Sequence, residues 1–294
     1  MEEKINCPIC ESKKINFFCE KKGYKLYKCF ACQLVFIWPL PSNLADIYQA
    51  SYFNGGLDDG KVNKFGYTDY ESDKRAMEET FIIYLDKISR LTTGRKIFDV
   101  GAASGYFLDL ARQADWQTSG AEISAYAAKI AGDKGHQIFL GNLENLKIKE
   151  KYDAVTMWDV LEHLPDPKRY LKSIHNILSQ DGILAINTIN RSSYWAKFWG
   201  KNWHAIIPPE HLFYYSTKSL KILLEASGFE ILEQLKIGKK FTLPYICKVF
   251  ANRYNFKILI KLFNFLDKDY WRRIYLPLNL RDNIFIIARK IKAF

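Results

Sequence analysis

The feature that most constrains the fold of this chain is a regular alternation of short apolar runs and amphipathic stretches that begins at residue 96. Strands that alternate with helices are typical of a parallel sheet covered by helices. We expect an α/β fold in which five parallel strands and a final pair form a doubly wound, seven-stranded sheet. Ligands bind such sheets at the carboxyl ends of the strands. The expected strands are 96–100, 118–123, 136–140, 152–158, 182–189, 230–237 and 282–290, and the expected helices are 73–91, 106–114, 124–135, 167–178 and 219–229, the last begun by the cap candidates Ser216 and Thr217.

The chain has 294 residues, which is enough for one large domain and a small module. Pro-rich punctuation near residue 40 closes a Cys-rich module at 1–40. We expect a linker and lid loop plus an N-terminal helix at 41–95, and the α/β domain at 96–294. Within that domain we expect a Trp-rich loop at 191–215 and a basic, aromatic, helical insert at about 238–280, before the last strand.

Four of the six cysteines form two CxxC pairs separated by 18 residues. This spacing lets four thiolates close a tetrahedral zinc site, which is structural because no coordination position stays open. A thioredoxin-like redox pair and cysteines without any metal are the alternatives. The predicted zinc ligands are Cys7, Cys10, Cys29 and Cys32, whereas we expect Cys19 and Cys247 to be packing residues.

A glycine-containing turn follows the first strand of the α/β domain, between Asp99 and the helix that begins near residue 106. Gly101 and Gly105 permit a tight turn and a close approach of a ligand to the backbone. Glu122 ends the next strand, where a carboxylate can accept both hydroxyls of a ribose. The pattern predicts a nucleotide-type cofactor site, with a nicotinamide-dependent dehydrogenase and a cofactor-free domain as alternatives.

With these residues the chain resembles the class I S-adenosylmethionine-dependent methyltransferases, from about Lys96 to Lys290. Within that superfamily it is similar to the branch with an N-terminal zinc ribbon. The resemblance implies a Rossmann-like methyltransferase sheet with an antiparallel last strand, and S-adenosylmethionine as cofactor. The segments that carry it are DVGAASGYF (99–107), AEIS (121–124), GNLENL (141–146), YDAVTMWDVLEHLPDP (152–167), DGILAINTIN (181–190), CQLVFIWPLPS (32–42) and PPEHLFYYS (208–216).

The resemblance also implies which residues hold the cofactor. Asp99 and the glycine turn are expected to hold its amino acid portion, and Glu122 its ribose. Residues 142–143 are expected at the adenine and residues 158–159 beside the reacting sulfonium. The expected cofactor-binding residues are Asp99, Gly101, Ala102, Ser104, Gly105, Tyr106, Phe107, Glu122, Ile123, Asn142, Leu143, Trp158 and Asp159.

Two positions depart from the family pattern. Ala103 stands where the middle glycine of the turn is common, which should narrow the turn while Gly101 and Gly105 stay intact. Asn142 stands where an acidic residue is frequent, so we expect backbone groups to contact the adenine. Neither change removes Glu122, the carboxylate expected at the ribose.

Histidines are the candidate bases. Methyl transfer from a sulfonium is an in-line displacement, and a hydroxyl acceptor must also lose a proton. Histidine is the side chain best suited to take that proton near neutral pH. The alternative for Glu162 and His163 is that they only cap the helix after Pro165. The candidate catalytic residues are His163, His211 and His204, whereas we expect His136 and His175 to be structural.

Aromatic side chains gather between residues 194 and 215, where we expect the acceptor to dock. Aromatic faces stack on sugar rings, bases and polyprenyl chains alike, so they indicate a pocket without naming its occupant. Half of these rings could instead belong to the core. By resemblance, we expect a small or lipid-linked acceptor, namely a hydroxyl of a sugar or cell-surface glycan precursor.

The positive charge of the chain is concentrated at its C-terminal end. Residues 236–294 carry 14 Lys and Arg against three Asp, a net charge of +11, and the preceding residues net to zero. On a helix, a basic stripe would lie opposite an aromatic face, which suits an anionic membrane surface. RNA would use the same charges, and a helix packed on the sheet edge with a solvated basic face is the third alternative. The stripe residues are Arg253, Lys257, Lys261 and Lys268.

The sequence therefore predicts a methyltransferase with a structural zinc ribbon. We expect a cytoplasmic protein, with peripheral membrane contact as an extension, because residues 1–10 lack the layout of a signal peptide and no apolar run is long enough to span a bilayer. An RNA methyltransferase is the second enzyme hypothesis. A zinc-ribbon binding module with an inactive methyltransferase fold is the hypothesis from another class.

Overall fold

The computed structural model describes three long stretches of the chain and the backbone of two short strand pairs. Every statement about the structure concerns these residues. The predicted lid loop lies outside them except for one of these strand pairs, and the predicted basic stripe of the insert lies outside them entirely. The described residues are 5–41, 77–235 and 280–291, with the strands β4 (Leu57–Asp58), β5 (Lys61–Val62), β13 (Lys239–Thr242) and β14 (Tyr275–Leu278).

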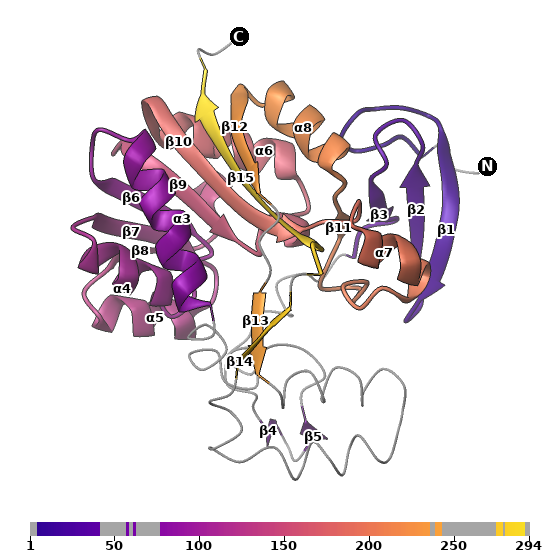
Figure 1. Cartoon of the computed structure of the whole chain (residues 1–294), viewed down its shortest axis with the longest axis horizontal. Coiled ribbons are helices and arrows are strands. Elements are labelled where there is room, and N and C mark those ends of the chain that lie inside the picture. Colours follow the sequence, from indigo (N-terminus) through magenta and orange to yellow (C-terminus); the bar gives the residue numbers. More distant parts are fainter. Residues whose placement is uncertain are drawn as a thin grey trace.

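A seven-stranded sheet forms the centre of the molecule, in the order β12-β15-β10-β9-β6-β7-β8 (Figure 1). The five strands from β6 to β10 are parallel, and β15 runs antiparallel to both of its neighbours. This confirms the predicted doubly wound sheet and its antiparallel last strand. The strands are β6 (Lys96–Val100), β7 (Gln117–Glu122), β8 (Gln137–Leu140), β9 (Tyr152–Trp158), β10 (Leu178–Ile189), β12 (Phe229–Leu235) and β15 (Asn283–Lys290).

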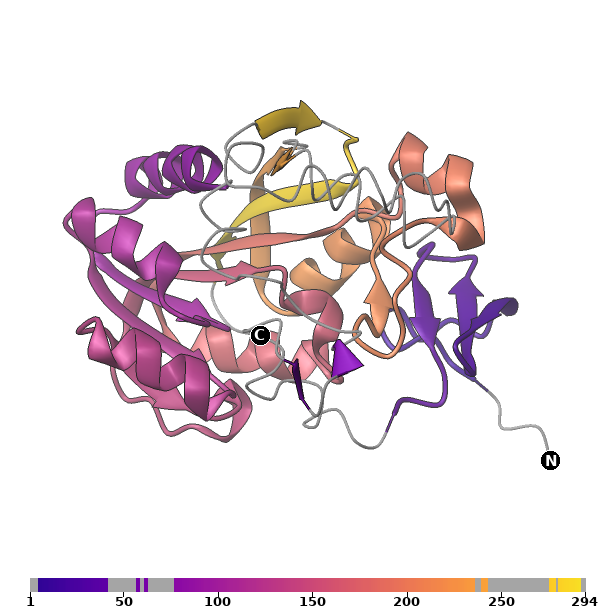
Figure 2. The ribbon, with the colours of Figure 1, turned by 90° about the horizontal axis from the view of Figure 1, so that it is seen from below.

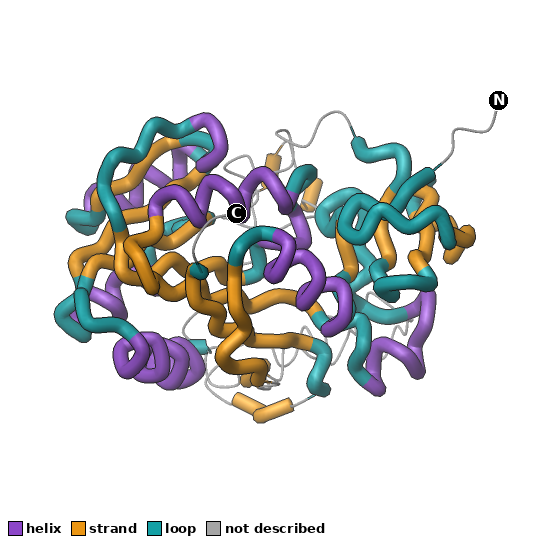
Figure 3. Tube along the Cα trace, turned by 90° about the horizontal axis from the view of Figure 1, so that it is seen from above, coloured by secondary structure: helices purple, strands orange, loops and turns teal. Residues whose placement is uncertain are grey.

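Helices cover both faces of this sheet, as the views from below and from above show (Figures 2 and 3). Helices α3 and α4 share one apolar cluster with side chains of the sheet, and α6 and α8 share another. None of the described helices is long and apolar enough to cross a membrane. The helices are α3 (Glu78–Leu91), α4 (Tyr106–Gln113), α5 (Ala125–Asp133), α6 (Pro167–Ile177), α7 (Tyr194–Trp199) and α8 (Thr217–Ala226), with the 3₁₀ turns η2 (Leu143–Asn145), η3 (Leu161–His163) and η4 (Gly200–Asn202).

The Cys-rich module forms a second sheet, which a strand from the α/β domain completes. β1 (Ile15–Lys21), β2 (Tyr24–Cys29) and β3 (Val35–Ile37) pair in order, and β11 (Phe213–Tyr214) pairs antiparallel with β3. Figure 1 shows this sheet beside α7, at the far end of the molecule from α3. We call the module at residues 5–41 the ribbon.

The predicted loop at 191–215 is therefore wrong in part, since it contains α7, η4 and β11. The Ser193 hydroxyl caps α7 by accepting from the Ala196 amide. β11 forms because β3 supplies backbone partners for Phe213 and Tyr214, and both rings are buried there. Backbone groups that leave water need such partners, and β3 lies far away in the sequence. Sequence periodicity over two residues could not show this pairing.

One apolar core runs from the ribbon into the α6 and α8 face of the central sheet. Leu26, Leu34 and Phe36 of the ribbon belong to the same buried cluster as Leu161 and Leu212 of the α/β domain. The boundary near residue 40 thus separates two sheets that share a core. The division at residues 40 and 95 stays a prediction.

Candidate functional site

The turn after β6 is held in a conformation that its glycines permit. Gly101 and Gly105 have φ values of +76° and +80°. A Cβ on Gly101 would lie 2.6 Å from Val160 Cγ2, and a Cβ on Gly105 would lie 2.9 Å from His136 Cδ2. Both positions therefore need glycine for backbone conformation and for space. Ala103 between them also has a positive φ, of +47°, so the turn keeps its shape at the cost of strain in a non-glycine residue.

Glu122 ties this turn to the next helix. Its Oε2 accepts a hydrogen bond from the Ala103 amide at 2.8 Å, and its Oε1 accepts one from the Ser124 amide at 2.8 Å. The side chain is buried, and burial raises the pKa of the carboxyl. A carboxylate has about four acceptor positions, so acceptor capacity remains for a ribose hydroxyl. The geometry fits the predicted role of Glu122.

The neighbouring strand ends are fixed by side-chain hydrogen bonds. Thr156 Oγ1 donates to Asp99 Oδ1 at 2.6 Å, which orients this buried carboxylate near the end of β6. Asn187 Nδ2 donates to Asp159 Oδ1 at 2.7 Å, and Asp159 takes a positive φ of +56° directly after β9. The carboxyl ends of β6, β9 and β10 therefore form a rigid rim.

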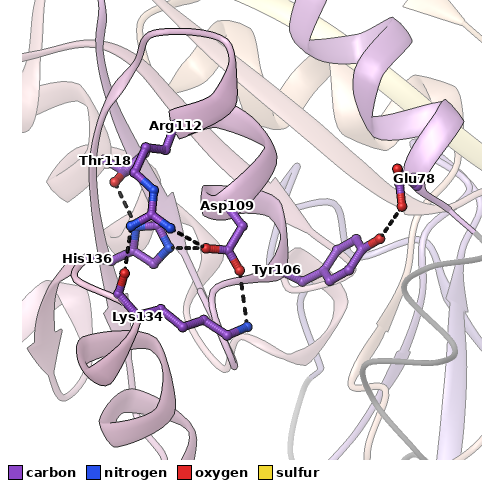
Figure 4. A network of polar contacts seen from close by, with 7 residues as sticks. All are labelled: Glu78, Tyr106, Asp109, Arg112, Thr118, Lys134 and His136. Atoms are coloured by element: carbon purple, nitrogen blue, oxygen red, sulfur yellow. Dashed lines mark hydrogen bonds and ion pairs between the residues drawn. The ribbon is translucent and has the colours of Figure 1, made fainter.

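A polar network lies behind the glycine turn (Figure 4). His136 bridges two side chains, with Nδ1 2.8 Å from Thr118 Oγ1 and Nε2 2.9 Å from Asp109 Oδ1. Arg112 and Lys134 also pair with the Asp109 carboxylate. Desolvation lowers the pKa of His136 despite Asp109. Since its ring touches the position that a Gly105 Cβ would occupy, His136 buttresses the turn, which agrees with the structural role expected from the sequence.

The other predicted cofactor residues lie at the carboxyl edge of the sheet, but the rings of Phe107 and Trp158 point into the core. Phe107 and Trp158 stand 4.7 Å apart between ring centroids and pack with Phe81 and Tyr84 of α3. Their backbones border the site while their rings belong to the core, because α3 covers this face of the sheet. Ala102, Ser104 and Leu143 are buried, Ile123 and Asn142 are exposed, and the Tyr106 hydroxyl donates to Glu78 Oε2 at 2.6 Å (Figure 4).

The structure brings two of the three candidate bases together. The rings of His163 and His211 meet edge to face, with centroids 4.7 Å apart. Nδ1 of His163 bonds the Glu210 carbonyl at 2.8 Å, and Nδ1 of His211 bonds the Ala205 carbonyl at 2.9 Å. A carbonyl can only accept, so each Nδ1 carries a proton and each Nε2 is the basic nitrogen. His204 instead lies 3.3 Å from Asp282 Oδ2 and is not part of this pair.

A buried carboxylate completes the His163 and His211 cluster. One ligand atom from Glu162 and one from each histidine lie within 4.8 Å of one another. Thr188 Oγ1 donates to Glu162 Oε2 at 2.7 Å. Burial lowers the pKa of His163 to about 4, so its imidazole is neutral at physiological pH. One carboxylate and two imidazoles can pass a proton, and they are also a set that binds divalent cations.

Two further expectations about this region are resolved. Glu162 and His163 do not cap the helix after Pro165, because the Asp166 carboxylate caps α6 by accepting from the Arg169 amide.

The aromatic cluster predicted between residues 194 and 215 divides into buried rings and exposed rings. Trp203, Phe213, Tyr214 and Tyr215 are fully buried, whereas Tyr194 and Phe198 of α7 are 81% and 79% exposed.

The four cysteines of the two CxxC pairs meet in the ribbon. Their sulfur atoms lie within 4.8 Å of one another, with Cys7 Sγ 3.5 Å from Cys32 Sγ and Cys10 Sγ 3.6 Å from Cys29 Sγ. Four thiolates around zinc at about 2.3 Å stand roughly 3.8 Å apart, so the set fits the metal. Cys19 is buried outside this group, as expected of a packing residue, and Cys247 lies outside the described residues.

The sequence did not predict the backbone partners of the histidine pair. The carbonyl of Glu210 and the strand β11 position His163 and His211, yet they come from a segment 47 residues after His163. The only local signal was that His211 directly precedes a run of apolar and aromatic residues.

This fold is that of the class I S-adenosylmethionine-dependent methyltransferases: a mixed sheet of five parallel strands with an antiparallel β15, a glycine turn after β6 and a carboxylate at the end of β7. Residues 74–234, more than half of the chain, match the family model described as a methyltransferase domain, and the chain belongs to that family.

Curated relatives cover part of the chain. It is 33% identical to the ubiquinone biosynthesis O-methyltransferase of Haemophilus ducreyi, in an alignment covering 34% of this chain and 47% of that protein. It is 26% identical to the enzyme of the same name from Bordetella avium, covering 49% of this chain and 66% of that protein. For the relative from Glaesserella parasuis the covered share is 52%. The chain therefore spans about half to two thirds of the length of these relatives.

Solved structures share the fold. The YcgJ protein of Bacillus subtilis superposes with a TM-score of 0.50 at 15% identity, covering 73% of this chain and 99% of that one. A chain of the Haloferax volcanii complex that contains the Trm112 methyltransferase activator gives a TM-score of 0.52 at 13% identity, covering 76% of this chain and 96% of that one. At these identities the likeness concerns the fold alone.

Proposed function

We propose that this protein transfers a methyl group from S-adenosylmethionine to a hydroxyl of a small or lipid-linked acceptor. The observation that carries the proposal is that the expected cofactor site and the histidine pair lie at the same edge of the central sheet, where the parallel strands end. The turn clamped by Glu122 would hold the cofactor, and the His163 and His211 pair lies past the end of β9, beyond Asp159. A donor site beside a base is the arrangement that O-methylation needs.

His211 is the stronger candidate for the base. A general base works best when its pKa lies near the working pH, and burial holds the pKa of His163 at about 4. His163 is then a neutral neighbour that contacts the His211 ring. When bound, S-adenosylmethionine supplies the activated methyl group. The protein aligns the acceptor and takes its proton at Nε2 of His211, because Nδ1 already donates to the Ala205 carbonyl.

The relatives support a hydroxyl acceptor, since their names describe O-methylation in ubiquinone biosynthesis. A sugar or glycan precursor, expected from the sequence, is named by none of the relatives described above. We therefore propose the acceptor class only as a hydroxyl on a small or lipid-linked molecule. The zinc ribbon is likewise a proposal, which the fit of the four cysteines to tetrahedral coordination supports.

Fractionation of a labelled extract tests this function. Purified protein is incubated with methyl-labelled S-adenosylmethionine and cell extract, and lipid, small-molecule, nucleic acid and protein fractions are separated. We expect label in the lipid or small-molecule fraction, and much less of it when Glu122→Gln protein replaces the wild type at the same cofactor concentration. Label in RNA would instead support an RNA methyltransferase. No label, together with no cofactor binding by calorimetry, would indicate an inactive fold.

A further inference from the structure

The ribbon is joined to the histidine pair by a short series of backbone contacts. Leu212, the residue after His211, lies at the centre of this series. Its amide donates to the Glu162 carbonyl at 2.9 Å, and its carbonyl accepts from the Ile37 amide of β3 at 3.0 Å. One residue thus connects the turn that carries His163 with a strand of the ribbon.

The zinc knuckle lies at the other end of this series. Cys32 comes three residues before β3, and its carbonyl accepts a hydrogen bond from Ser216 Oγ at 2.7 Å, with both groups buried. β11 lies between Leu212 and Ser216 and pairs with β3 through Phe213 and Tyr214. The segment from Leu212 to Ser216 is therefore attached to the ribbon at both of its ends and through the two residues of β11.

Glu210, just before this segment, and Tyr214 within it contact the two histidines. Glu210 provides the carbonyl that orients His163 at 2.8 Å, and the Tyr214 hydroxyl donates to the His211 carbonyl at 2.9 Å. If β11 left β3, the Glu210 carbonyl and the His211 ring would lose their fixed place beside His163. The hydrogen bonds described above for the glycine turn and Glu122 involve no residue of the ribbon.

We propose that the cysteine knuckle is a positioning element for the acceptor half of the site, and that it holds His211 against His163 through β3, β11 and Ser216. This inference rests on the proposed function, because it treats His211 as a residue that acts on the acceptor. Zinc at the four thiolates fixes the Cys32 carbonyl and the start of β3. Loss of the metal releases residues 209–216 and leaves cofactor binding in place.

Hydrogen exchange and calorimetry on the full chain test this directly. Zinc is removed from the wild-type protein with a chelator, and amide exchange is followed by mass spectrometry in residues 209–216 and in the glycine turn. We expect exchange in 209–216 to rise about tenfold or more, because the segment opens locally. The dissociation constant for S-adenosylmethionine should change less than about twofold, since affinity reports the cofactor half alone.

If removal of zinc unfolds the whole ribbon, a single substitution at Ser216 can still test whether the ribbon holds residues 209–216. Ser216→Ala deletes the bond to the Cys32 carbonyl, and Ser216→Thr retains a hydroxyl and should restore protection. Ser216 also caps α8, so Asp166→Ala, which removes the cap of α6, is the matched control for the loss of a cap. We expect faster exchange in 209–216 for Ser216→Ala only. The same variant should lower kcat without changing KM for S-adenosylmethionine.

Two results would overturn the inference. Unchanged exchange in 209–216, both after zinc removal and in Ser216→Ala, would show that the ribbon does not hold this segment. Loss of cofactor binding in parallel with the exchange would show that the knuckle supports the whole domain. If the purified protein contains no zinc, the proposed metal is refuted, and the Ser216 variants alone decide whether the ribbon holds residues 209–216. If the protein has no methyltransferase activity but the exchange results are as expected, the proposed function is refuted and the link between the ribbon and the histidine pair stands.

Discussion

The cofactor half and the acceptor half of the site are built in different ways. The cofactor half consists of a turn and a carboxylate from consecutive strands, with Glu122 bonded to Ala103 only 19 residues away. In the acceptor half, His163 bonds Glu210 across 47 residues, and Ser216 bonds Cys32 across 184 residues. The first half depends on local geometry, whereas the second depends on the docking of two sheets. Substitutions in one half should therefore leave the other intact.

The largest effect is expected for His211→Ala. Loss of a general base reduces turnover by about 10²- to 10⁴-fold. The affinity for S-adenosylmethionine should stay within about twofold of the wild type, since the cofactor half is separate. Steady-state kinetics with the acceptor found by labelling, together with calorimetry, measure both quantities. His204→Ala is the matched control and should retain turnover, because His204 pairs with Asp282. If His211→Ala and His163→Ala both keep near wild-type turnover, neither residue is the base.

The free energy of unfolding should depend on pH through two groups of the acceptor half, His163 and Glu210. The folded pKa of His163 is about 4, below its ordinary value of 6.5, so the unfolded state binds the proton first. The stability that neutral His163 contributes is complete above pH 6.5 and is lost as the pH falls towards 4. Glu210 has a pKa raised to about 7 by burial and acts in the opposite direction, because its stability contribution is lost as the pH rises through 7.

Comparison of the wild type with His163→Gln isolates the contribution of His163 to the pH dependence of the free energy of unfolding. The free energy of unfolding is measured by denaturant for both proteins at several pH values. We expect the wild type to lose about 2 to 3 kcal/mol more than the variant between about pH 7.5 and about pH 4.5. Identical pH profiles for the two proteins would contradict the burial of a neutral His163. Glu210 and the ribbon are common to both proteins, so their contributions cancel.

Glu122→Gln should weaken the binding of S-adenosylmethionine and leave the acceptor half unchanged. Charge-assisted hydrogen bonds contribute about 1.5 to 3 kcal/mol, so the dissociation constant for S-adenosylmethionine should rise about 10- to 100-fold. Exchange in 209–216 should not change. Calorimetry and hydrogen exchange measure the two effects, and Glu150→Gln, which removes an exposed carboxylate paired with Lys96 at the start of β6, is the control. Unaltered cofactor affinity would remove Glu122 from the ribose site.

The smallest effect is expected for Ala103→Gly. The φ of +47° strains alanine, and glycine relieves that strain while it adds freedom to the unfolded chain. The two terms oppose each other, so we expect a change in the free energy of unfolding of at most about 1 kcal/mol. Denaturant titration measures it. A larger loss would show that the Ala103 methyl group packs usefully, and Ala102→Gly is the comparison for a buried alanine nearby.

Metal analysis sharpens the contrast between the ribbon and the histidine pair. We expect one zinc per chain, lost when Cys10→Ser removes one thiolate. A second equivalent that disappears in His163→Ala would place a cation among Glu162, His163 and His211. The histidines would then act as ligands, and the acceptor hydroxyl would lose its proton at the metal.

The two halves also differed in how far the sequence predicted them. The alternation of strands and helices, the glycine turn and Glu122 followed from patterns within a few tens of residues, because βα units fold by local rules. Trp158 and Phe107 were placed beside the cofactor, yet their rings pack under α3, since a motif fixes the backbone and not the direction of a side chain. The pairing of β11 with β3 depends on residues far apart in the chain, so no local pattern revealed it.

The antiparallel contact between β3 and β11 has a consequence for the order in which the chain folds. The ribbon is the first part of this sequence to be synthesised, but its fourth strand comes only at Phe213 and Tyr214. Contacts between distant segments form late, because a long loop must close first. During synthesis the edge of β3 is therefore left without its native partner until residues 213–214, nearly three quarters of the way along this sequence, have emerged. That interval is when a chaperone would be most useful to this protein.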